Sequence, residues 1–320
     1  NLKTILVTGS CGFIGFHLSK ALLEKGFTVI GLDNLNDYYD INLKKDRLEI
    51  LQKDKNFHFY FDDLINLRRI NNFKSNINFA INLAAQAGVR LPENQNYKYE
   101  HSNVNGFCSF LEFCKQNNVQ NILYASSSSV YSGIKEIPYR EDFKLLGPSS
   151  KYAETKIMNE DEANNFAIKY KKNVIGLRFF TVYGPWGRPD MAYYKFTKSI
   201  LDNKEIILFN NGKLSRDMTY IDDIVSGILS AIDYIEKSTE NHEIFNLGNS
   251  ISVNTDTLLR IIQDKFKVNG LIKYINNPKE VTMTLADCSK SKALLNYEPK
   301  VKIESGMEAF FDWFGSYYRI

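Results

Sequence analysis

The sequence has little of what marks a metal, disulfide or membrane protein. Its 320 residues include four cysteines, which form no CxxC pair and no ligand-spaced cluster with the four histidines, so neither zinc nor a disulfide framework is expected. No apolar run approaches the roughly 20 residues of a membrane span, and the first residues show no signal-peptide pattern. We therefore expect a cytoplasmic chain that binds no metal and contacts no membrane.

The sequence also has few prolines and glycines and a small net charge. Seven prolines and 18 glycines exclude a collagen-like or linker-dominated chain, and 44% hydrophobic with 24% charged residues is typical of a globular protein. The 40 Lys and Arg nearly balance the 37 Asp and Glu, and a net charge of +3 gives no reason to expect a nucleic-acid partner. The length favours two domains, or one large domain with an appendage.

Short apolar segments alternate with helical patterns through the first half of the chain. Most lack period-two alternation, as expected for parallel strands that are covered on both faces. The expected strands are 3–9, 27–34, 57–63, 77–85, 121–131 and 173–184, and the helical segments between them include 14–25, 99–117 and 150–171. This alternation predicts an α/β fold with a doubly wound parallel sheet.

After Gly184 the alternation weakens, and a further strand-like segment returns at 242–248. The remaining residues are mostly helical with short strands. We therefore predict two interleaved domains, one formed by residues 1–180 and 218–248 and a smaller one formed by 181–217 and 249–320.

A glycine-rich turn joins the first expected strand to the first expected helix. Gly9, Gly12 and Gly15 allow a tight turn and a close approach to a pyrophosphate, which the amides at the helix N-terminus would bind. Asp33 ends the second strand about 20 residues later, where a carboxylate accepts the ribose hydroxyls of NAD and repels the 2′-phosphate of NADP. This spacing predicts NAD binding, with Asp63 able to reach the adenine.

A tyrosine and a lysine lie one helical turn apart in the segment that follows Ser150. Tyr152 and Lys156 share a helix face at i, i+4, and a nearby cation could lower the tyrosine pKa from about 10 toward neutral. Ser127 stands at the expected carboxyl end of a strand, where a doubly wound sheet binds its ligands. Together these residues predict proton transfer to and from a substrate hydroxyl.

Four motifs now carry a family resemblance: NLAAQAGVR (82–90), ASSSSVY (125–131), YAETK (152–156) and LRFFTVYGPWGRPDMA (177–192). The resemblance covers essentially the whole chain, from TGSCGFIG (8–15) through SRDMTYIDD (215–223) to LADCSKSKALLNYEP (285–299), and it is to the extended short-chain dehydrogenases/reductases. Within that family the motifs are most similar to nucleotide-sugar 4-epimerases that act on UDP-glucuronate. The resemblance implies a Rossmann-type domain with tightly bound NAD, a smaller domain that closes over UDP, and a homodimer through helices 99–117 and 150–171.

The resemblance also assigns roles to individual residues. Ser127, Tyr152 and Lys156 stand at the catalytic positions. The positions that bind the cofactor are Gly9, Gly12, Phe13, Ile14, Gly15, Asp33, Asn34, Asn36, Asp63, Leu64, Leu83, Ala84, Ala85, Ala87, Asn103, Ser126, Tyr152, Lys156, Phe180 and Val182. The expected substrate-binding residues are Arg90, Ser128, Ser129, Thr181, Arg188, Arg216 and Glu280, with Arg216 at the pyrophosphate.

Several reactions remain open at this stage. The resemblance implies conversion of UDP-glucuronate to UDP-galacturonate through a 4-keto sugar, with a product used for polysaccharide biosynthesis. Ser128 and Ser129 stand where the family's dehydratases and decarboxylases generally carry a glutamate, which favours simple epimerisation. The alternatives are a 4-epimerase of UDP-glucose or UDP-N-acetylglucosamine, a UDP-sugar decarboxylase or dehydratase, and a non-catalytic NAD-binding regulator.

Overall fold

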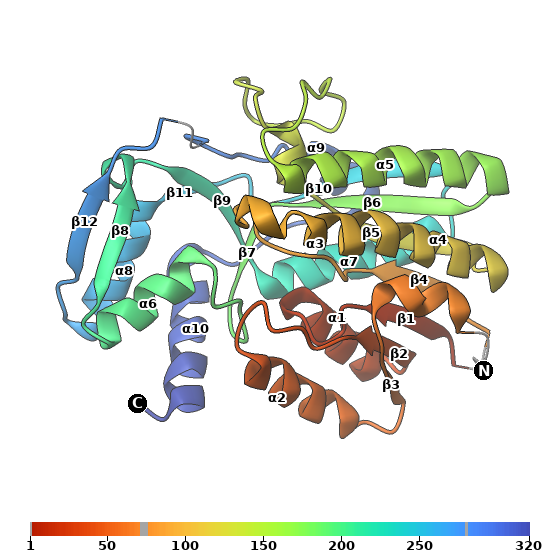
Figure 1. The fold of residues 1–320 in the computed structure, drawn as a ribbon, viewed down its shortest axis with the longest axis horizontal. Coiled ribbons are helices and arrows are strands. Elements are labelled where there is room, and N and C mark those ends of the chain that lie inside the picture. Colours follow the sequence, from red (N-terminus) through yellow and green to blue (C-terminus); the bar gives the residue numbers. More distant parts are fainter. Residues whose placement is uncertain (1, 71–75, 279–280) are drawn as a thin grey trace.

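A seven-stranded parallel sheet forms the centre of the larger lobe. The structure, a computed structural model, describes residues 2–70, 76–278 and 281–320. The sheet order is β10-β6-β5-β4-β1-β2-β3 (Figure 1). The strands are β1 (Thr4–Thr8), β2 (Thr28–Asp33), β3 (Phe57–Phe61), β4 (Phe79–Asn82), β5 (Asn121–Ser127), β6 (Asn173–Phe179) and β10 (His242–Leu247). The predicted doubly wound sheet is confirmed, and all seven of its strands lie within segments expected from the sequence.

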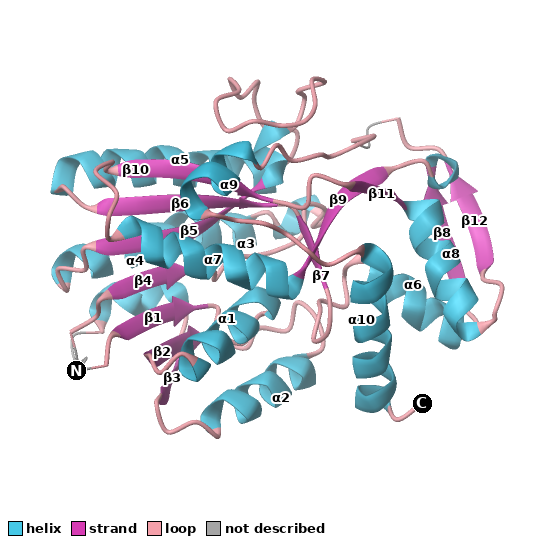
Figure 2. Cartoon of the chain, turned by 180° about the vertical axis from the view of Figure 1, so that it is seen from behind, coloured by secondary structure: helices cyan, strands magenta, loops and turns pink. Residues whose placement is uncertain are grey.

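Helices cover both faces of this sheet. α4 (Gly106–Gln116) and α5 (Lys151–Tyr170) lie on one face, and α1 (Phe13–Glu24) and α7 (Ile221–Ile235) lie on the other, with α2 (Ile41–Gln52) beside α1 (Figures 1 and 2). Phe107, Phe110 and Phe113 of α4 are buried against the sheet on their side. The apolar core on the α1 and α7 side continues into the smaller lobe, so one core joins both lobes.

Three segments that the sequence predicts as single elements are divided in the structure. The segment 99–117 contains α3 (Tyr97–Tyr99), a π-helical turn (Glu100–Asn105) and α4 rather than one helix. The strand expected to reach residue 131 ends at Ser127, whose hydroxyl accepts a hydrogen bond from the Ser129 amide (3.1 Å) and caps a 3₁₀ turn. The strand expected over 173–184 breaks after Phe179, and β7 (Thr181–Tyr183) pairs with β9 of the smaller lobe.

The smaller lobe contains two small sheets and three helices. β7, β9 (Ser215–Tyr220) and β11 (Ser252–Asn254) form one sheet, and β8 (Glu205–Phe209) pairs with β12 (Leu271–Ile275) in the other. The helices are α6 (Ala192–Leu201), α8 (Thr255–Phe266) and α10 (Ile303–Tyr318). A further short helix, α9 (Ser289–Leu295), instead contacts α7 and β10 of the larger lobe. The interleaved division into 1–180 with 218–248 and 181–217 with 249–320 stays a proposal.

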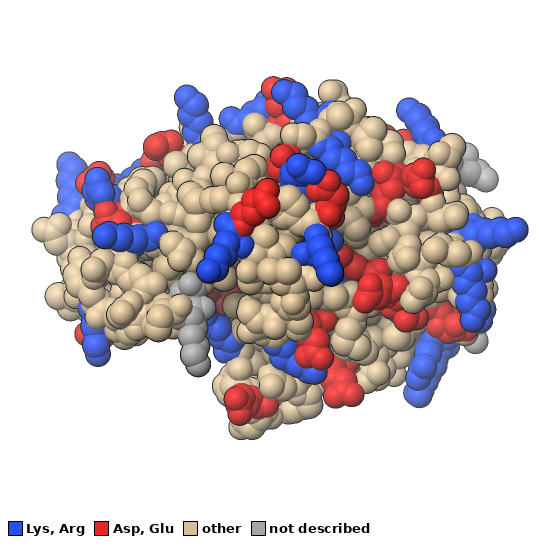
Figure 3. All heavy atoms as spheres, turned by 90° about the horizontal axis from the view of Figure 1, so that it is seen from above, with Lys and Arg blue, Asp and Glu red and all other residues tan. Residues whose placement is uncertain are grey.

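The surface carries charges of both signs. On the face shown in Figure 3, lysine and arginine side chains are interspersed with aspartate and glutamate. Over the described ranges, no helix is both long and apolar enough to cross a membrane.

Candidate active site

A cavity of about 870 Å³ lies at the carboxyl ends of the main-sheet strands and is lined by both lobes. Its wall includes the glycine turn after β1, the serines that follow β5, the start of α5 and the loop after β7. The cavity is therefore at the edge where a doubly wound sheet binds a dinucleotide, with the smaller lobe closing its other side.

Nearly every residue that the sequence proposes for the site lines this cavity. Asn103 does not: its side chain is 1% exposed and lies behind the wall. There its Oδ1 accepts a hydrogen bond from the Gln86 amide (2.8 Å), and its Nδ2 donates to Thr155 (3.1 Å). Asn103 thus supports the loop after β4 rather than facing the cavity. Glu280 lies outside the described residues.

The glycine turn has the shape that a pyrophosphate requires. Gly9 adopts a φ of +69°, and a Cβ there would lie 2.7 Å from the backbone nitrogen of Ala84. A Cβ on Gly12, which begins α1, would meet only the Gly9 carbonyl within 4 Å, so its other side is open to the cavity. Amides at the start of α1 can therefore face an anion in this space, which fits the phosphates of a dinucleotide.

Two carboxylates lie at the adenosine end of the cavity. Asp33 is 8% exposed, and its oxygens accept hydrogen bonds from the amides of Cys11 and Leu35, both at 2.9 Å. These bonds tie the glycine turn to the end of β2. Burial raises the pKa of Asp63, but hydrogen bonds from Ile65, His101 and Asn34 outweigh it and lower the pKa below its ordinary value. Both acids can accept hydroxyl donors of a ribose or amino donors of an adenine.

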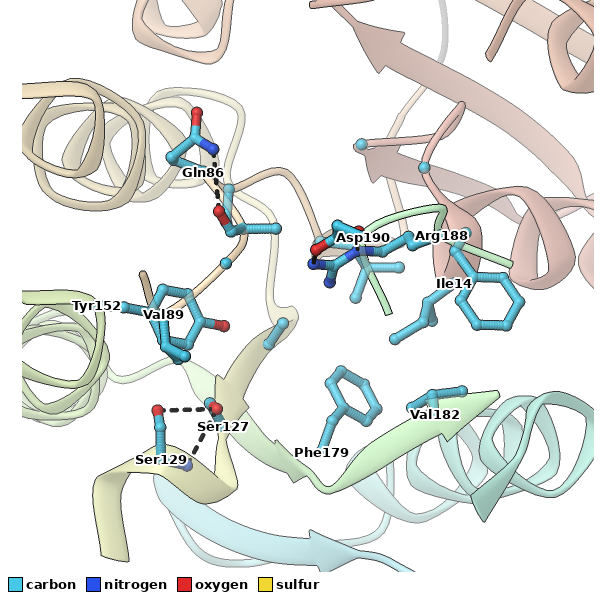
Figure 4. A pocket seen from close by; sticks show the side chains of 18 of the residues that line it. Ile14, Gln86, Val89, Ser127, Ser129, Tyr152, Phe179, Val182, Arg188 and Asp190 are labelled. Carbon is cyan, nitrogen blue, oxygen red and sulfur yellow. Dashed lines mark hydrogen bonds and ion pairs between the residues drawn. The ribbon is translucent and has the colours of Figure 1, made fainter. Parts of the chain in front are cut away.

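The predicted catalytic residues Ser127, Tyr152 and Lys156 all line the cavity, and Figure 4 shows the first two. Tyr152 projects into the cavity from the first turn of α5, whose N-cap Ser150 accepts a hydrogen bond from the Ala153 amide. Ser127 lies at the end of β5, and its hydroxyl accepts a hydrogen bond from the Ser129 hydroxyl (2.9 Å). The Lys156 Nζ donates to the Ala125 carbonyl (3.0 Å) and lies 5.6 Å from the centre of the Tyr152 ring.

Burial and a nearby charge act in opposite directions on Tyr152. Burial raises the pKa of Tyr152 above its ordinary value, and the positive charge of Arg188 and a hydrogen bond with Ser127 oppose this rise. Burial also lowers the pKa of Lys156 to about 8, against the opposing charge of Glu160. Among the described residues, Arg188 is thus a cation that opposes the effect of burial on Tyr152, and Lys156 donates to the backbone of β5.

The arginines occupy two places in the cavity wall. Arg188 donates to both oxygens of Asp190, at 3.0 and 2.6 Å, and Figure 4 shows this pair across the cavity from Tyr152. Arg216 of β9 donates to the carbonyls of Ser215 and Val281, both at 2.8 Å, and its pKa is lowered by burial and by the charge of Arg90. Arg90 and Arg216 thus form one cationic region, and Arg188 lies in another.

Some residues in the wall were not foreseen from the sequence. Among them are Tyr38, Lys44, Gln86, Asp190, Met191 and Lys195. Lys44 is on α2 yet only 5% exposed, and its Nζ donates to the side chain and carbonyl of Asn36 (2.7 and 2.8 Å). A lysine in an amphipathic helix ordinarily indicates the solvated face, so no sequence signal distinguished it.

Comparisons with known proteins agree with this geometry. The sequence pattern of the NAD dependent epimerase/dehydratase family matches residues 5–248. The chain belongs to this family. A curated relative, UDP-glucuronate 4-epimerase 4 of Arabidopsis thaliana, is 44% identical over 98% of this chain and 76% of its own length.

Solved structures share the whole fold. A crystal structure of UDP-glucuronic acid 4-epimerase from Bacillus cereus, in complex with UDP-glucuronic acid and NAD, has a TM-score of 0.89. It is 31% identical, and the match covers 98% of this chain and 100% of that one. UDP-glucose 4-epimerase from Thermotoga maritima, with UDP-glucose, has a TM-score of 0.86, 27% identity and coverage of 98% and 99%. As a member of this family, the chain is an NAD-dependent isomerase.

The position of Asp33 predicts the choice of cofactor. We expect Asp33→Ser to raise the affinity for NADP relative to NAD by about tenfold or more, because the carboxylate that repels a 2′-phosphate is removed. The measurement is the dissociation constant of each dinucleotide for the variant after removal of retained cofactor. Asp62→Asn, at the same end of the cavity, is the matched control and should leave the ratio within a few-fold of wild type. An unchanged ratio in Asp33→Ser would contradict the assignment.

Proposed function

We propose that this protein is a UDP-glucuronate 4-epimerase that interconverts UDP-glucuronate and UDP-galacturonate. The observation that carries the proposal is the meeting of Tyr152, the serines after β5 and the cationic Arg188 in one cavity, beside a dinucleotide-binding turn. The Arabidopsis and Bacillus cereus relatives, whose names state this activity, support it.

Each catalytic residue has a task that follows from its position. The chemistry supplied by bound NAD is the acceptance and return of a hydride. Tyr152, as the tyrosinate, takes the proton of the sugar 4-hydroxyl, which leaves a 4-keto sugar, and gives a proton back after the sugar has turned its other face. Ser127 holds the 4-oxygen in both states. Lys156 donates from the floor of the site and is suited to a ribose hydroxyl of the cofactor.

The enzyme must also keep the sugar carboxylate from being lost as carbon dioxide. A 4-keto glucuronate is a β-keto acid that readily loses carbon dioxide, so an epimerase must hold the carboxylate in an orientation that discourages cleavage. Ser128, Ser129 and Thr181 provide hydroxyl donors in the wall of the cavity, and Arg188 provides a positive charge across the cavity from Tyr152. We assign Arg188 to the carboxylate and Arg90 with Arg216 to the UDP phosphates.

The lining of the cavity favours epimerisation over dehydration or decarboxylation. In the described residues, the acids that line it are Asp33, Asp62, Asp63 and Asp190. The first three follow β2 and β3, at the adenosine end, and Asp190 is paired with Arg188. A dehydratase needs a carboxylate that acts on the sugar ring, and Ser128 and Ser129 stand at that place instead.

Product analysis tests the proposal. The purified protein is incubated with UDP-glucuronate, UDP-glucose and UDP-N-acetylglucosamine separately, without added NAD, and the products are resolved by chromatography and NMR. We expect UDP-galacturonate from the first substrate, with the cofactor retained from purification, and much slower conversion of the neutral sugars. Release of carbon dioxide with a UDP-pentose, or faster conversion of a neutral sugar, would overturn it.

We also propose a homodimer that forms through α4 and α5, and a role in polysaccharide biosynthesis, which uses uronic acids as building blocks. Met158 and Ile168 of α5 are 43% and 58% exposed, which supports contact with a second copy. Light scattering should give twice the mass of one chain. We propose the cytoplasm as the location, where the free thiols of Cys11, Cys108, Cys114 and Cys288 would stay reduced.

A further inference from the structure

Arg47 is a buried cation that has no task in the proposed reaction. It lies on α2, it is 0% exposed, and within the described chain all its hydrogen-bond acceptors are uncharged. Its Nη1 donates to the Cys11 carbonyl (2.9 Å) and the Tyr39 hydroxyl (2.6 Å), and its Nη2 donates to two carbonyls of a loop 139 residues away in sequence. Burying a charge without a carboxylate is costly, so this position requires an explanation.

The two loop carbonyls belong to Trp186 and Gly187, at 2.5 and 3.1 Å from Nη2. Cys11 is part of the glycine turn. Arg47 therefore links the cofactor-binding turn of the larger lobe to the segment that follows β7 and precedes Arg188. Other side chains of the larger lobe can contact this segment, but Arg47 holds the carbonyl that is bonded directly to the Arg188 nitrogen.

The same segment is held at other points. Burial lowers the pKa of His17 to about 4, so its ring is neutral, and its Nε2–H donates to the Pro185 carbonyl (2.8 Å). The Trp186 ring packs against Phe16, Trp313 and Tyr317 at centroid distances of 5.2–5.6 Å. Trp186 has a φ of +61°, a left-handed conformation that is unfavourable for a bulky side chain. The surrounding contacts must offset this strain.

The segment after Trp186 carries two charged side chains into the cavity wall. Arg188 and Asp190, two and four residues after Trp186, line the cavity and pair with each other, and the Tyr38 hydroxyl donates to Asp190 (3.3 Å). Figure 4 shows the Arg188 and Asp190 pair opposite Tyr152. The backbone on the N-terminal side of Arg188 is thus fixed by Arg47, and its guanidinium is fixed by Asp190.

We propose that Arg47 is a positioning residue that acts through Arg188, holding its guanidinium toward the sugar carboxylate and so setting the preference for an anionic sugar. This inference rests on the proposed function, since it takes Arg188 as the carboxylate partner. Arg47 itself is fully buried and is not among the described residues that line the cavity. Its contribution is the conformation of the Pro185–Asp190 segment, which leaves the cationic region of Arg90 and Arg216 unchanged.

A double-mutant cycle tests this coupling. Dissociation constants for UDP, UDP-glucose and UDP-glucuronate, and KM and kcat for UDP-glucuronate, are measured for wild type, Arg47→Met, Arg188→Met and the double variant. In each single variant, we expect the affinity for UDP-glucuronate to fall about tenfold or more relative to the affinity for UDP-glucose, because a charged hydrogen bond is lost. The affinity for UDP should stay within about twofold of wild type. The double variant should lose no more than Arg188→Met alone.

Arg47→Lys keeps the charge and part of the donor set, and it should restore part of the preference. It also replaces Arg47→Met in the cycle if that variant fails to fold. Arg260→Met, on the exposed face of α8, is the matched arginine control and should leave the preference unchanged. Losses that add in the double variant, or equal weakening of UDP and UDP-glucuronate, would overturn the proposal. A wild-type enzyme that itself shows no preference for UDP-glucuronate would instead contradict the proposed function.

Discussion

Tyr152→Phe should lower kcat for UDP-glucuronate by about 100-fold or more, since general acid–base catalysis contributes roughly 10²–10⁴-fold. The substitution removes the hydroxyl that moves the 4-hydroxyl proton and keeps the ring that packs 6.1 Å from Tyr99. Binding of UDP-glucuronate and retention of NAD should stay within a few-fold of wild type. The measurement is steady-state turnover together with the dissociation constant of UDP-glucuronate.

Tyr139→Phe is the matched control for this variant. Tyr139 lines the same cavity, but its hydroxyl donates only to the backbone carbonyls of Ile134 and Met283, at 3.4 and 3.5 Å. We expect its turnover to remain within a few-fold of wild type. If Tyr152→Phe also retained turnover within a few-fold, the assignment of proton transfer to Tyr152 would be wrong.

The second large effect is expected at a buried ion pair beneath the catalytic helix. Glu160, one turn after Lys156 on α5, accepts two hydrogen bonds from Arg178 of β6 (2.8 and 2.7 Å) and one from Ser126 (2.5 Å). The side chains of Glu160 and Arg178 are only 9% and 4% exposed. Glu160→Gln leaves the Arg178 charge buried without its carboxylate, so we expect a loss of about 3–5 kcal/mol in the free energy of unfolding. Urea denaturation measures it.

A paired replacement distinguishes an unpaired charge from lost packing. The double variant Glu160→Met with Arg178→Met removes both charges, and it should be more stable than either single methionine variant. The exposed pair of Asp256 and Arg260 on α8 is the control, where Asp256→Asn should cost no more than about 0.5 kcal/mol. A double variant as unstable as the sum of the two single losses would contradict this explanation.

The parts of the site that depend on local spacing could be predicted from the sequence. Gly9, Gly12 and Asp33 are recognised because a turn and a strand end lie at a known distance along the chain, and the structure places all three in the cavity wall. Tyr152 and Lys156 are recognised because one helical turn separates them. The strand pattern likewise predicted the parallel sheet, since buried strands read as continuous apolar runs.

Long-range contacts were the part that could not be predicted. Arg47 and Lys44 received no role from the sequence, and Arg47 owes part of its contacts to the loop after β7, which is distant in sequence. Asn103 was placed at the cofactor, but the π-helical turn that contains it directs it to Gln86 and Thr155 instead. The effect of Arg188 on the pKa of Tyr152 could not be predicted either, because it depends on the loop after β7 that brings Arg188 into the cavity wall.

Substrate deuterated at C4 tests the central claim most directly. UDP-glucuronate that carries deuterium at C4 is incubated with the enzyme in ordinary water, and the product is examined by NMR and mass spectrometry. If Tyr152 moves only the hydroxyl proton and the hydrogen on C4 leaves and returns as a hydride, the UDP-galacturonate formed keeps its deuterium at C4. Loss of that deuterium to water, or product inverted at another carbon, would contradict the account.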